Sequence, residues 1–448
     1  MNFRTDKQTL KDLEIFDSYN SKQSIYSLFG SVQSIGARNK LHYFLNNPVT
    51  DIEIIKNRSD AIAFFSKIDF IADLDIDKNT LDFIEHYLLQ SDYPTKPPSK
   101  IRAIERAFQY KIKPSNEYYI IERGIDYIID LLNNMHSFAL KLADMKCPEL
   151  IEENNNKIIS FLELPELAKV KSIRGMQKLK AVDVASFDYV FRYMYKDVVR
   201  FFLELVYEYD VFLAVSEVAV KKGYSYPEIL QAKEFVLEVD GLFHPFIKDA
   251  IRNDLKLTVQ DNLLFLTGSN MAGKSSLLKA LSLSVYLAHV GFPVPAQKAR
   301  VSVLNGLYTT INLSDNLNLG YSHFYSEVIR IKEIVESLRE KRNILVVFDE
   351  LFRGTNVKDA YDGSLAIISA LSDIKNCFFT VSTHILEISE ELKDKESIQF
   401  RYMETVFSDG YPQYTYLLKE GVSEDRMGMY IIKKEGILDM LTSICKKE

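Results

Sequence analysis

The sequence predicts an α + α/β chain, in which a domain of long helices, residues 1–230, precedes a domain with a mainly parallel sheet, residues 231–448. Glycine is scarce in the first part, and apolar residues recur there at three- and four-residue spacing, as at Leu41, Phe44 and Leu45. In the second part, short apolar runs alternate with helical segments, a pattern typical of a parallel sheet covered by helices.

Helix-breaking and helix-capping residues predict where helices end and begin in the first part. The segment 46–48, Asn-Asn-Pro, ends one helix, and Thr50 or Asp51 can cap the next. The longer stretches 117–146 and 186–220 are each long enough for a helix of about seven to nine turns. Paired helices of this length suggest struts or levers.

Five apolar runs in the second part are expected to form strands. The last two enclose a helical segment at residues 358–371, as in a strand–helix–strand unit. The five runs are residues 263–266, 301–303, 307–312, 344–348 and 378–382.

Composition indicates an ordinary globular protein, with 47% hydrophobic and 26% charged residues among 448. The three cysteines lie far apart and form no C-x-x-C pair, which favours a reducing compartment and disfavours a structural zinc site. The first residues are polar and mixed in charge, and no run reaches the ~20 apolar residues of a membrane span. We therefore expect a cytoplasmic protein with no membrane contact.

Charge gives no global argument for a nucleic-acid partner. The formal net charge is −7, with 30 basic and 33 acidic residues in 1–230 and 25 basic and 29 acidic residues in 231–448. Any contact with nucleic acid must therefore come from a local patch.

One such patch lies in the first part. Its residues can contact DNA phosphates, or they can be a solvated surface or pack on acidic neighbours, as charge runs usually do. Residues 169–180 contain no acid and five basic residues, Lys169, Lys171, Arg174, Lys178 and Lys180.

The segment 268–275 satisfies the phosphate-loop pattern G-x-x-x-x-G-K-[ST] at every fixed position, between a strand-like run and a helix-like run. Such a loop turns its backbone N–H groups toward phosphate oxygens, and the following helix adds partial positive charge. Lys274 is expected to bridge the β- and γ-phosphates, and the Ser275 hydroxyl to ligate Mg²⁺. The alternative is a glycine-containing turn without a ligand. The residues expected to bind nucleotide are Gly268, Ser269, Asn270, Met271, Ala272, Gly273, Lys274, Ser275 and Ser276.

Two further motifs complete the expected nucleotide site. Asp349 and Glu350 end a buried run, so Asp349 can hold Mg²⁺ and Glu350 can polarise the attacking water, although both could instead cap the next helix. His384 follows another apolar run, where it would face the crevice at the carboxyl ends of the strands. There it could hydrogen-bond the γ-phosphate or the water, whereas a lone histidine is usually structural.

The order of these motifs resembles the MutS family of DNA mismatch-repair ATPases, within the wider ABC-type ATPase superfamily. Five segments with matching order and spacing carry the resemblance, and a fainter similarity to the family's core, or lever, domain lies in residues 36–58. The five segments are the phosphate loop with Asn270 and Met271, residues 293–298, the signature loop at 315–327, residues 349–355 and residues 382–384.

The resemblance implies a lever region at residues 10–230 and an ATPase domain at about 235–440. It also implies that Ser322 completes the nucleotide site of a second subunit in trans, so that ATP binding closes a homodimer and moves the levers on double-stranded or branched DNA. Lys274, Glu350 and His384 are then the catalytic residues, and ATP and Mg²⁺ the cofactors.

The sequence also departs from the family pattern. The chain begins at the core domain, so we expect no mismatch-reading or connector domain, and the stretch between the long helices is short for a DNA clamp. His323 stands where a small hydroxyl residue is usual, and no aromatic residue near 250–253 matches the family's adenine-stacking residue.

An alternative function is an ATP-gated switch that acts on a protein partner and never touches DNA. The acidic net charge and the departures from the family favour it. A GTPase is disfavoured because no Asn-Lys-x-Asp motif occurs. A small-molecule kinase is disfavoured because the sequence offers no obvious acceptor pocket.

Overall fold

The chain folds into two compact units. Met1–Ile25, Asn47–Lys56 and Lys221–Glu448 form one, the sheet unit, and Tyr26–Asn46 and Asn57–Val220 form the other, the helical unit. The computed structural model describes residues 3–17, 23–68, 74, 77–90, 96–97, 99–112, 116–173, 179–231, 235–311, 323–340, 342–352, 354–408, 411–423, 436–438 and 440. The domain boundary expected at residue 230 stays a prediction, but Met1–Ile25 and Asn47–Lys56 pack within the sheet unit.

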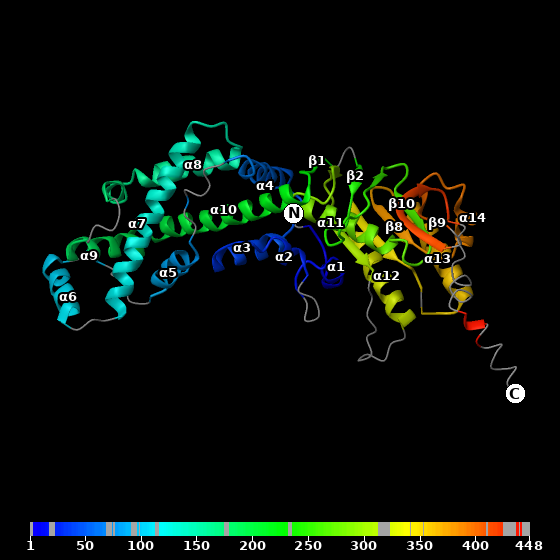
Figure 1. Ribbon diagram of the computed structural model, residues 1–448, viewed down its shortest axis with the longest axis horizontal. Helices are drawn as coiled ribbons and strands as arrows, with labels where there is room; N and C mark the ends of the chain where they lie inside the picture. Colours follow the sequence, from blue (N-terminus) through cyan, green and yellow to red (C-terminus); the bar gives the residue numbers. More distant parts are fainter. Residues whose placement is uncertain are drawn as a thin grey trace. The chain divides into compact units, whose positions relative to one another are not determined.

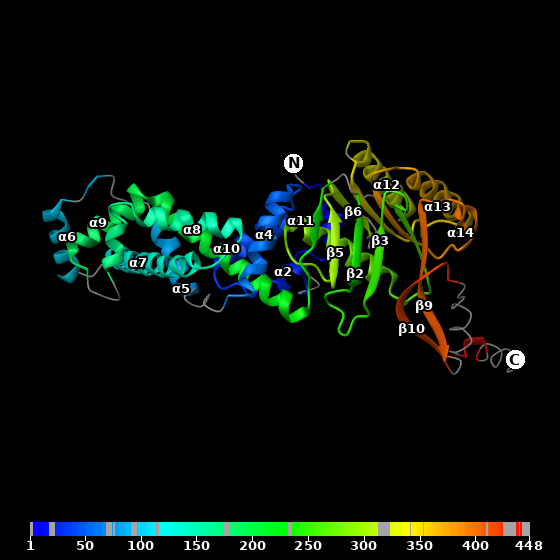
Figure 2. The ribbon, with the colours of Figure 1, turned by 90° about the horizontal axis from the view of Figure 1, so that it is seen from above.

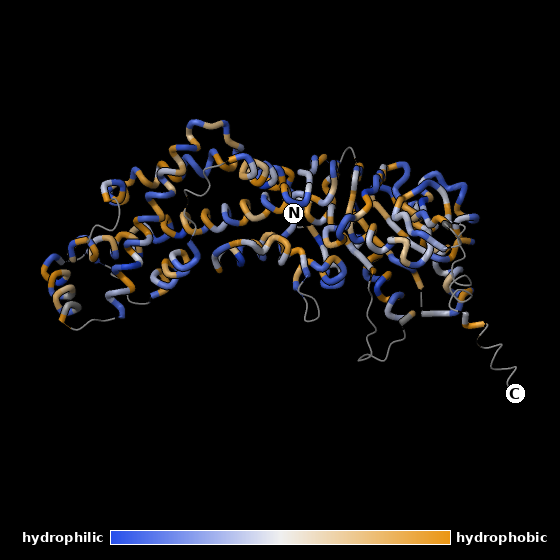
Figure 3. The backbone as a smooth tube through the Cα atoms, viewed as in Figure 1, coloured by the Kyte–Doolittle hydropathy of each residue, from blue (hydrophilic) through white to orange (hydrophobic). Residues whose placement is uncertain are grey.

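The helical unit is built from helices whose apolar residues share one face. α7 buries Ile121, Ile125, Ile128 and Leu132 at helical spacing, and Figure 3 shows hydrophobic and hydrophilic residues alternating along the long helices. Its helices are α3 (Ile35–Asn46), α5 (Lys78–Leu88), α6 (Lys100–Ile112), α7 (Asn116–Ala143), α8 (Glu149–Leu162), α9 (Ala181–Tyr189) and α10 (Lys196–Lys222, which ends in the sheet unit), with a 3₁₀ turn at Ala168–Ser172 (Figure 1). α2 (Ile25–Leu28) and α4 (Ile52–Phe65) each begin in the sheet unit and end in the helical unit.

The continuous helix expected at residues 186–220 is interrupted. α9 passes into a π-helical turn, Val190–Met194, and Tyr195 then leaves the helical region before α10 begins. Arg192 in this turn pairs with Asp188 through two hydrogen bonds of 2.6 and 2.7 Å, and both side chains are buried. A buried charge needs such a partner, and Asp188 supplies it from one helical turn earlier in the chain.

The first expected helix boundary is confirmed. α3 ends at Asn46, directly before Asn47 and Pro48. The Asp51 carboxylate accepts hydrogen bonds from the backbone N–H of Glu53 and Ile54, so Asp51 caps α4.

A six-stranded, mainly parallel sheet forms the core of the sheet unit. β4, β7 and β8 are completely buried, as strands covered on both faces are. Its order is β10-β9-β4-β8-β7-β6, with only β10 antiparallel to its neighbour. The strands are β4 (Leu263–Thr267), β6 (Gly306–Thr310), β7 (Ile344–Asp349), β8 (Phe378–Ser382), β9 (Ile398–Ser408) and β10 (Tyr411–Glu420). The predicted fold class is confirmed.

A four-stranded sheet lies beside it in the same unit, and Figure 2 shows β5, β2 and β3 side by side. α11 contacts β2 of this sheet and β6, β7 and β8 of the larger one, so nearly all of its residues are buried. The small sheet consists of β1 (Glu228–Leu230), β5 (Lys298–Ser302), β2 (Leu237–Leu242) and β3 (Asn253–Leu257). The remaining helices are α1 (Lys7–Asp12), α11 (Lys274–Val290), α12 (His323–Glu340), α13 (Val357–Ser372) and α14 (Glu387–Leu392). Among the helices described, none is long and apolar enough to cross a membrane.

Candidate nucleotide site

The carboxyl ends of β4, β7 and β8 meet at one edge of the large sheet because these strands are parallel neighbours. The predicted phosphate loop leaves β4 at this edge and leads into α11. Three of its residues have positive φ, Gly268 at 136°, Met271 at 70° and Gly273 at 100°. The glycines also allow close approach, because a Cβ at Gly268 would lie 3.0 Å from the Met403 carbonyl oxygen on β9.

The Lys274 side chain is buried and folds back over the loop. Its ammonium group donates hydrogen bonds to the carbonyl oxygens of Gly268, at 2.8 Å, and Ser269, at 3.3 Å. The Ser269 hydroxyl in turn lies 2.8 Å from the Thr405 hydroxyl of β9, which holds the loop against the sheet. An ammonium group held at such a loop is suited to bind phosphate oxygens.

Oxygen ligands for a hard cation collect beside the loop. Asp349, at the end of β7, is 5% exposed and accepts hydrogen bonds from the Ser275 hydroxyl, at 2.5 Å, and from the Ser382 hydroxyl. A buried carboxylate facing a hydroxyl matches the ligands that Mg²⁺ prefers. Ser275 and Asp349 therefore fit the predicted metal site.

Glu350 and His384 form the outer part of the site. Glu350 has a φ of 61°, and its backbone N–H donates to the Ser382 carbonyl oxygen at 3.1 Å. His384 Nε2 lies 2.7 Å from Glu350 Oε1 and 3.3 Å from Lys274 Nζ. One ring nitrogen cannot donate to the carboxylate and accept from the ammonium at once, and the shorter distance favours donation to Glu350.

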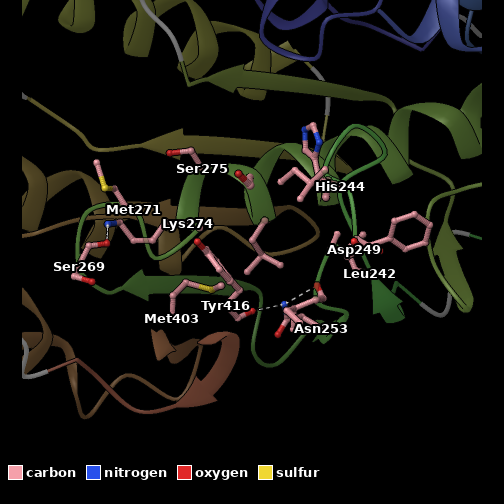
Figure 4. Close-up of a pocket in the computed structure, with 18 of the residues that line it drawn as sticks. Leu242, His244, Asp249, Asn253, Ser269, Met271, Lys274, Ser275, Met403 and Tyr416 are labelled. Atoms are coloured by element: carbon pink, nitrogen blue, oxygen red, sulfur yellow. Dashed lines mark hydrogen bonds between the residues drawn. The ribbon is translucent and has the colours of Figure 1, made fainter. Parts of the chain in front are cut away.

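A pocket of about 510 Å³ extends from the loop. Figure 4 shows Lys274 and Ser275 at one part of it and His244 and Asp249 at another, with Tyr416 of β10 and Met403 of β9 below them in the view. The lining at the loop is mainly polar, and that of the far end includes the apolar residues Leu242, Phe243, Ile247, Ala250 and Ile251 beside the polar residues His244, Lys248, Asp249 and Asn253. A pocket with a phosphate-binding end and a partly apolar far end is suited to a nucleotide.

Comparison with known proteins agrees with this geometry. Residues 264–447 match the family model described as MutS domain V. The proteins named DNA mismatch repair protein MutS from Aquifex pyrophilus and Anaplasma phagocytophilum are 30% and 32% identical over 54% and 51% of this chain. Residues 264–447 therefore carry a MutS-type domain V, and the predicted resemblance to the family is confirmed.

The MutS similarity continues toward the N-terminus. The MutS protein of Petrotoga mobilis is 23% identical over 82% of this chain, which is 48% of the relative's length. The two matches above cover 28% of each relative. The chain thus spans less than half the length of these curated relatives.

The sequence did not reveal one pocket residue, Tyr416. Its ring approaches the loop so closely that a Cβ at Gly273 would lie 3.2 Å from Tyr416 Cδ1. Asn253 holds this part of β10 in place, donating to the Tyr416 carbonyl oxygen at 2.9 Å and accepting from the Leu418 N–H at 2.7 Å. Tyr416 itself has a φ of 57° and lies where the register of β10 shifts, so no local pattern marks it.

The remaining predicted residues of the loop are divided between the pocket and the protein interior. Asn270, Met271 and Ser276 line the pocket. Ala272 is completely buried. Ser322, Arg174 and Lys178 lie outside the described residues.

The described part of the basic patch lies in the helical unit. Lys169 and Lys171 lie on the 3₁₀ turn Ala168–Ser172, and Lys180 precedes α9. Asn133 of α7 fixes this turn by donating to the Ile173 carbonyl oxygen at 2.9 Å. Lys169 and Lys180 are exposed, as contact with a phosphate backbone requires.

Proposed function

We propose that this chain binds and hydrolyses ATP. The observation that supports it most is the convergence of Lys274, Ser275, Asp349, Glu350 and His384 at one edge of the sheet, beside a pocket of about 510 Å³. The groups come from three separate segments, so a glycine-containing turn without a ligand does not explain their meeting.

Each group has a distinct role in the proposed reaction. Lys274 neutralises charge on the β- and γ-phosphates, and Ser275 and Asp349 hold Mg²⁺, which when bound stabilises the negative charge of the reacting phosphates. Glu350 accepts a proton from the attacking water, and His384 orients the Glu350 carboxylate through their 2.7 Å contact.

The adenine base occupies the apolar end of the pocket in this proposal. Tyr416 packs over the loop at Gly273, and its ring offers a flat face for stacking. Adenine stacking is therefore assigned to Tyr416 of β10, because residues 250–253 contain no aromatic side chain.

We further propose that the site is completed by Ser322 of a second copy and that closure of the dimer moves the helical unit on DNA. The names of the curated relatives and the basic residues Lys169, Lys171, Arg174, Lys178 and Lys180 support a DNA partner. The net charge of −7 favours the alternative, a switch that acts on a protein partner.

Two measurements test these proposals. ATP hydrolysis by the full chain is compared with that of Lys274→Ala, and absence of any difference would exclude the assigned site. Hydrolysis and binding are then measured with linear, mismatched and branched duplexes at several salt concentrations, because phosphate contacts weaken steeply with salt. Binding to none of these duplexes at low salt would leave the protein-partner alternative.

A further inference from the structure

The N-terminal residues 3–17, here called the N-terminal strap, extend the edge of the large sheet. Arg4 lies parallel to Gly306 of β6, where its N–H donates to the Asn305 carbonyl oxygen at 2.8 Å and its carbonyl accepts from the Leu307 N–H at 3.0 Å. The approach requires glycine, because a Cβ at Gly306 would lie 2.7 Å from the Arg4 carbonyl oxygen. The strap is therefore built into the sheet.

The helix of the strap, α1, fixes the carboxyl end of β6. Asp12 is 1% exposed and accepts hydrogen bonds from the Thr309 hydroxyl, at 2.7 Å, and from the Ile311 N–H, at 2.9 Å. The Thr9 hydroxyl accepts a further bond from the Thr309 N–H at 3.0 Å. Ile311 is the last described residue before the segment 312–322, so the strap holds the strand end that leads into this segment.

The strap also fixes α12, the helix that follows the same segment. Arg330 is 7% exposed and donates to the Asp6 carboxylate, at 2.5 Å, and to the Thr309 carbonyl oxygen, at 2.9 Å. Arg4 pairs with Glu340 at the other end of α12, over 2.5 Å. Buried Arg330 thus joins α12, β6 and the strap at one point, about two turns from the start of the helix.

Both ends of the strap contact α11, the helix that begins with Lys274. Glu14 pairs with Lys279 over 3.1 Å in the second turn of α11. At the other end, the Phe3 ring lies 4.3 Å from the ring of His289, in the last turn of α11. The strap therefore links the helix of the phosphate loop to the two elements that flank 312–322.

We propose that the N-terminal strap is a positioning element for hydrolysis at the nucleotide site of the partner subunit. It holds β6 and α12 at fixed positions relative to α11, and thereby fixes both flanks of the segment that carries Ser322. This inference rests on the proposed function, in which Ser322 acts in trans. Asp6 and Arg330 act through α12 and do not touch the nucleotide.

A strap with a purely structural role would stabilise the fold without positioning groups for hydrolysis. The structural role and the positioning role differ in measurable ways. The pocket residues of the same subunit do not include Asp6, Asp12 or Arg330. Weakening the strap should therefore lower kcat and leave ATP affinity nearly unchanged. Misplacement of a reacting group by about 1 Å can cost on the order of 100-fold in rate.

The test uses the full chain with Arg330→Met, which keeps the aliphatic stem and removes the charge. Asp6→Asn is the second variant, because asparagine still caps α1 while it loses the ion pair. Arg339→Met is the matched control, since Arg339 is exposed on the same helix. We expect kcat to fall about 10- to 100-fold in the first two variants, with the dissociation constant of a fluorescent ATP analogue within about twofold of the unmodified chain.

Mixing variants then tests the action in trans. Arg330→Met has an intact pocket and a disturbed α12, whereas Glu350→Gln has the reverse, so their mixed dimer contains one complete site. Recovery of hydrolysis well above the sum of the two separate variants supports the proposal. Asp6→Asn replaces Arg330→Met in this mixture if the latter does not fold.

The outcomes separate the two proposals. If the unmodified chain hydrolyses no ATP, or Glu350→Gln is fully active, the proposed function fails. If the unmodified chain is active but Arg330→Met and Asp6→Asn keep its kcat, or the mixture recovers nothing, only the role of the strap is overturned. A loss of ATP affinity in both strap variants would also overturn it.

Discussion

His384 Nε2 lies 2.7 Å from Glu350 Oε1, so that residues following two neighbouring parallel strands, β8 and β7, meet in one contact. The Glu350 side chain is 24% exposed, and that of His384 is 38% exposed. This carboxylate is therefore accessible to a water molecule and is also fixed from one side. Those are the requirements for a general base in phosphoryl transfer.

Glu350→Gln should lower ATP turnover by about 100- to 10,000-fold, the usual contribution of a general base. Glutamine keeps the size of the side chain, so nucleotide binding should persist and the ATP-bound dimer should accumulate. Steady-state phosphate release and light scattering measure the two effects. Glu336→Gln, an exposed change on α12, is the control, and unchanged turnover in Glu350→Gln would remove Glu350 from the mechanism.

His384→Ala should lower turnover by about 10- to 100-fold when Glu350 is present, and by less than about threefold in the Glu350→Gln background. The reason is that, in the proposed reaction, His384 orients the Glu350 carboxylate, so its effect depends on that carboxylate. A double-mutant cycle of single-turnover rates measures the coupling. If the effects of His384→Ala and Glu350→Gln on the rate simply multiply, His384 acts on the phosphate or the water independently of Glu350.

Features of the fold that depend on contiguous residues could be predicted from the sequence. The phosphate loop and the apolar runs that became β4, β7 and β8 are local patterns, so their positions could be read directly. The strand β10 was not predicted, because it is half exposed and lacks a continuous apolar run. The strands β1, β2, β3 and β9 were not predicted either.

Contacts made by distant segments could not be predicted in the same way. Tyr416 reaches the loop from β10 because Asn253 holds the bulged strand, and Asp12 reaches Thr309 across about 300 residues of chain. An aspartate in a short helix has the same local pattern whether it is solvated or buried. Only the tertiary fold distinguishes these cases.

Tyr416→Ala should weaken ATP binding by about 5- to 150-fold, which corresponds to the ~1–3 kcal/mol of a base–aromatic stack. Tyr416→Phe keeps the ring and should bind within about threefold of the unmodified chain. Tyr411→Ala, an exposed position on the same strand, serves as the control. Equilibrium titration with ATP provides the measurement, and equal affinity in Tyr416→Ala would place the base elsewhere.

Replacing Lys169, Lys171 and Lys180 by glutamine should reduce the dependence of DNA binding on salt. Each lost phosphate contact lowers the slope of log K against log salt by about 0.9 for duplex DNA. Fluorescence anisotropy at several salt concentrations measures this slope, and Lys332→Gln on α12 is a control outside the patch. An unchanged slope would show that these lysines are only solvated.

The buried His289 should make the stability of the sheet unit depend on pH. Its Nε2 accepts a hydrogen bond from the Leu304 N–H at 3.2 Å, so in the neutral ring Nδ1 carries the proton and donates to the Val49 carbonyl oxygen at 2.9 Å. Burial lowers the pKa of His289 to about 4, against which the Val49 contact acts only partly. Protonating Nε2 would also place two N–H groups against each other at Leu304.

The folded state therefore binds this proton only near pH 4, whereas the unfolded chain binds it near pH 6.5. The contribution of His289 to the free energy of unfolding is fully present above pH 6.5. It falls by about 3 kcal/mol as the pH drops toward 4. Urea unfolding at pH 4.5 to 7.5 gives the free energy of unfolding of the unmodified chain and of His289→Gln as a function of pH. The difference between the slopes of the two curves isolates the contribution of His289, and the variant is expected to be less stable at every pH. Identical slopes would show that His289 binds its proton equally in the folded and unfolded states.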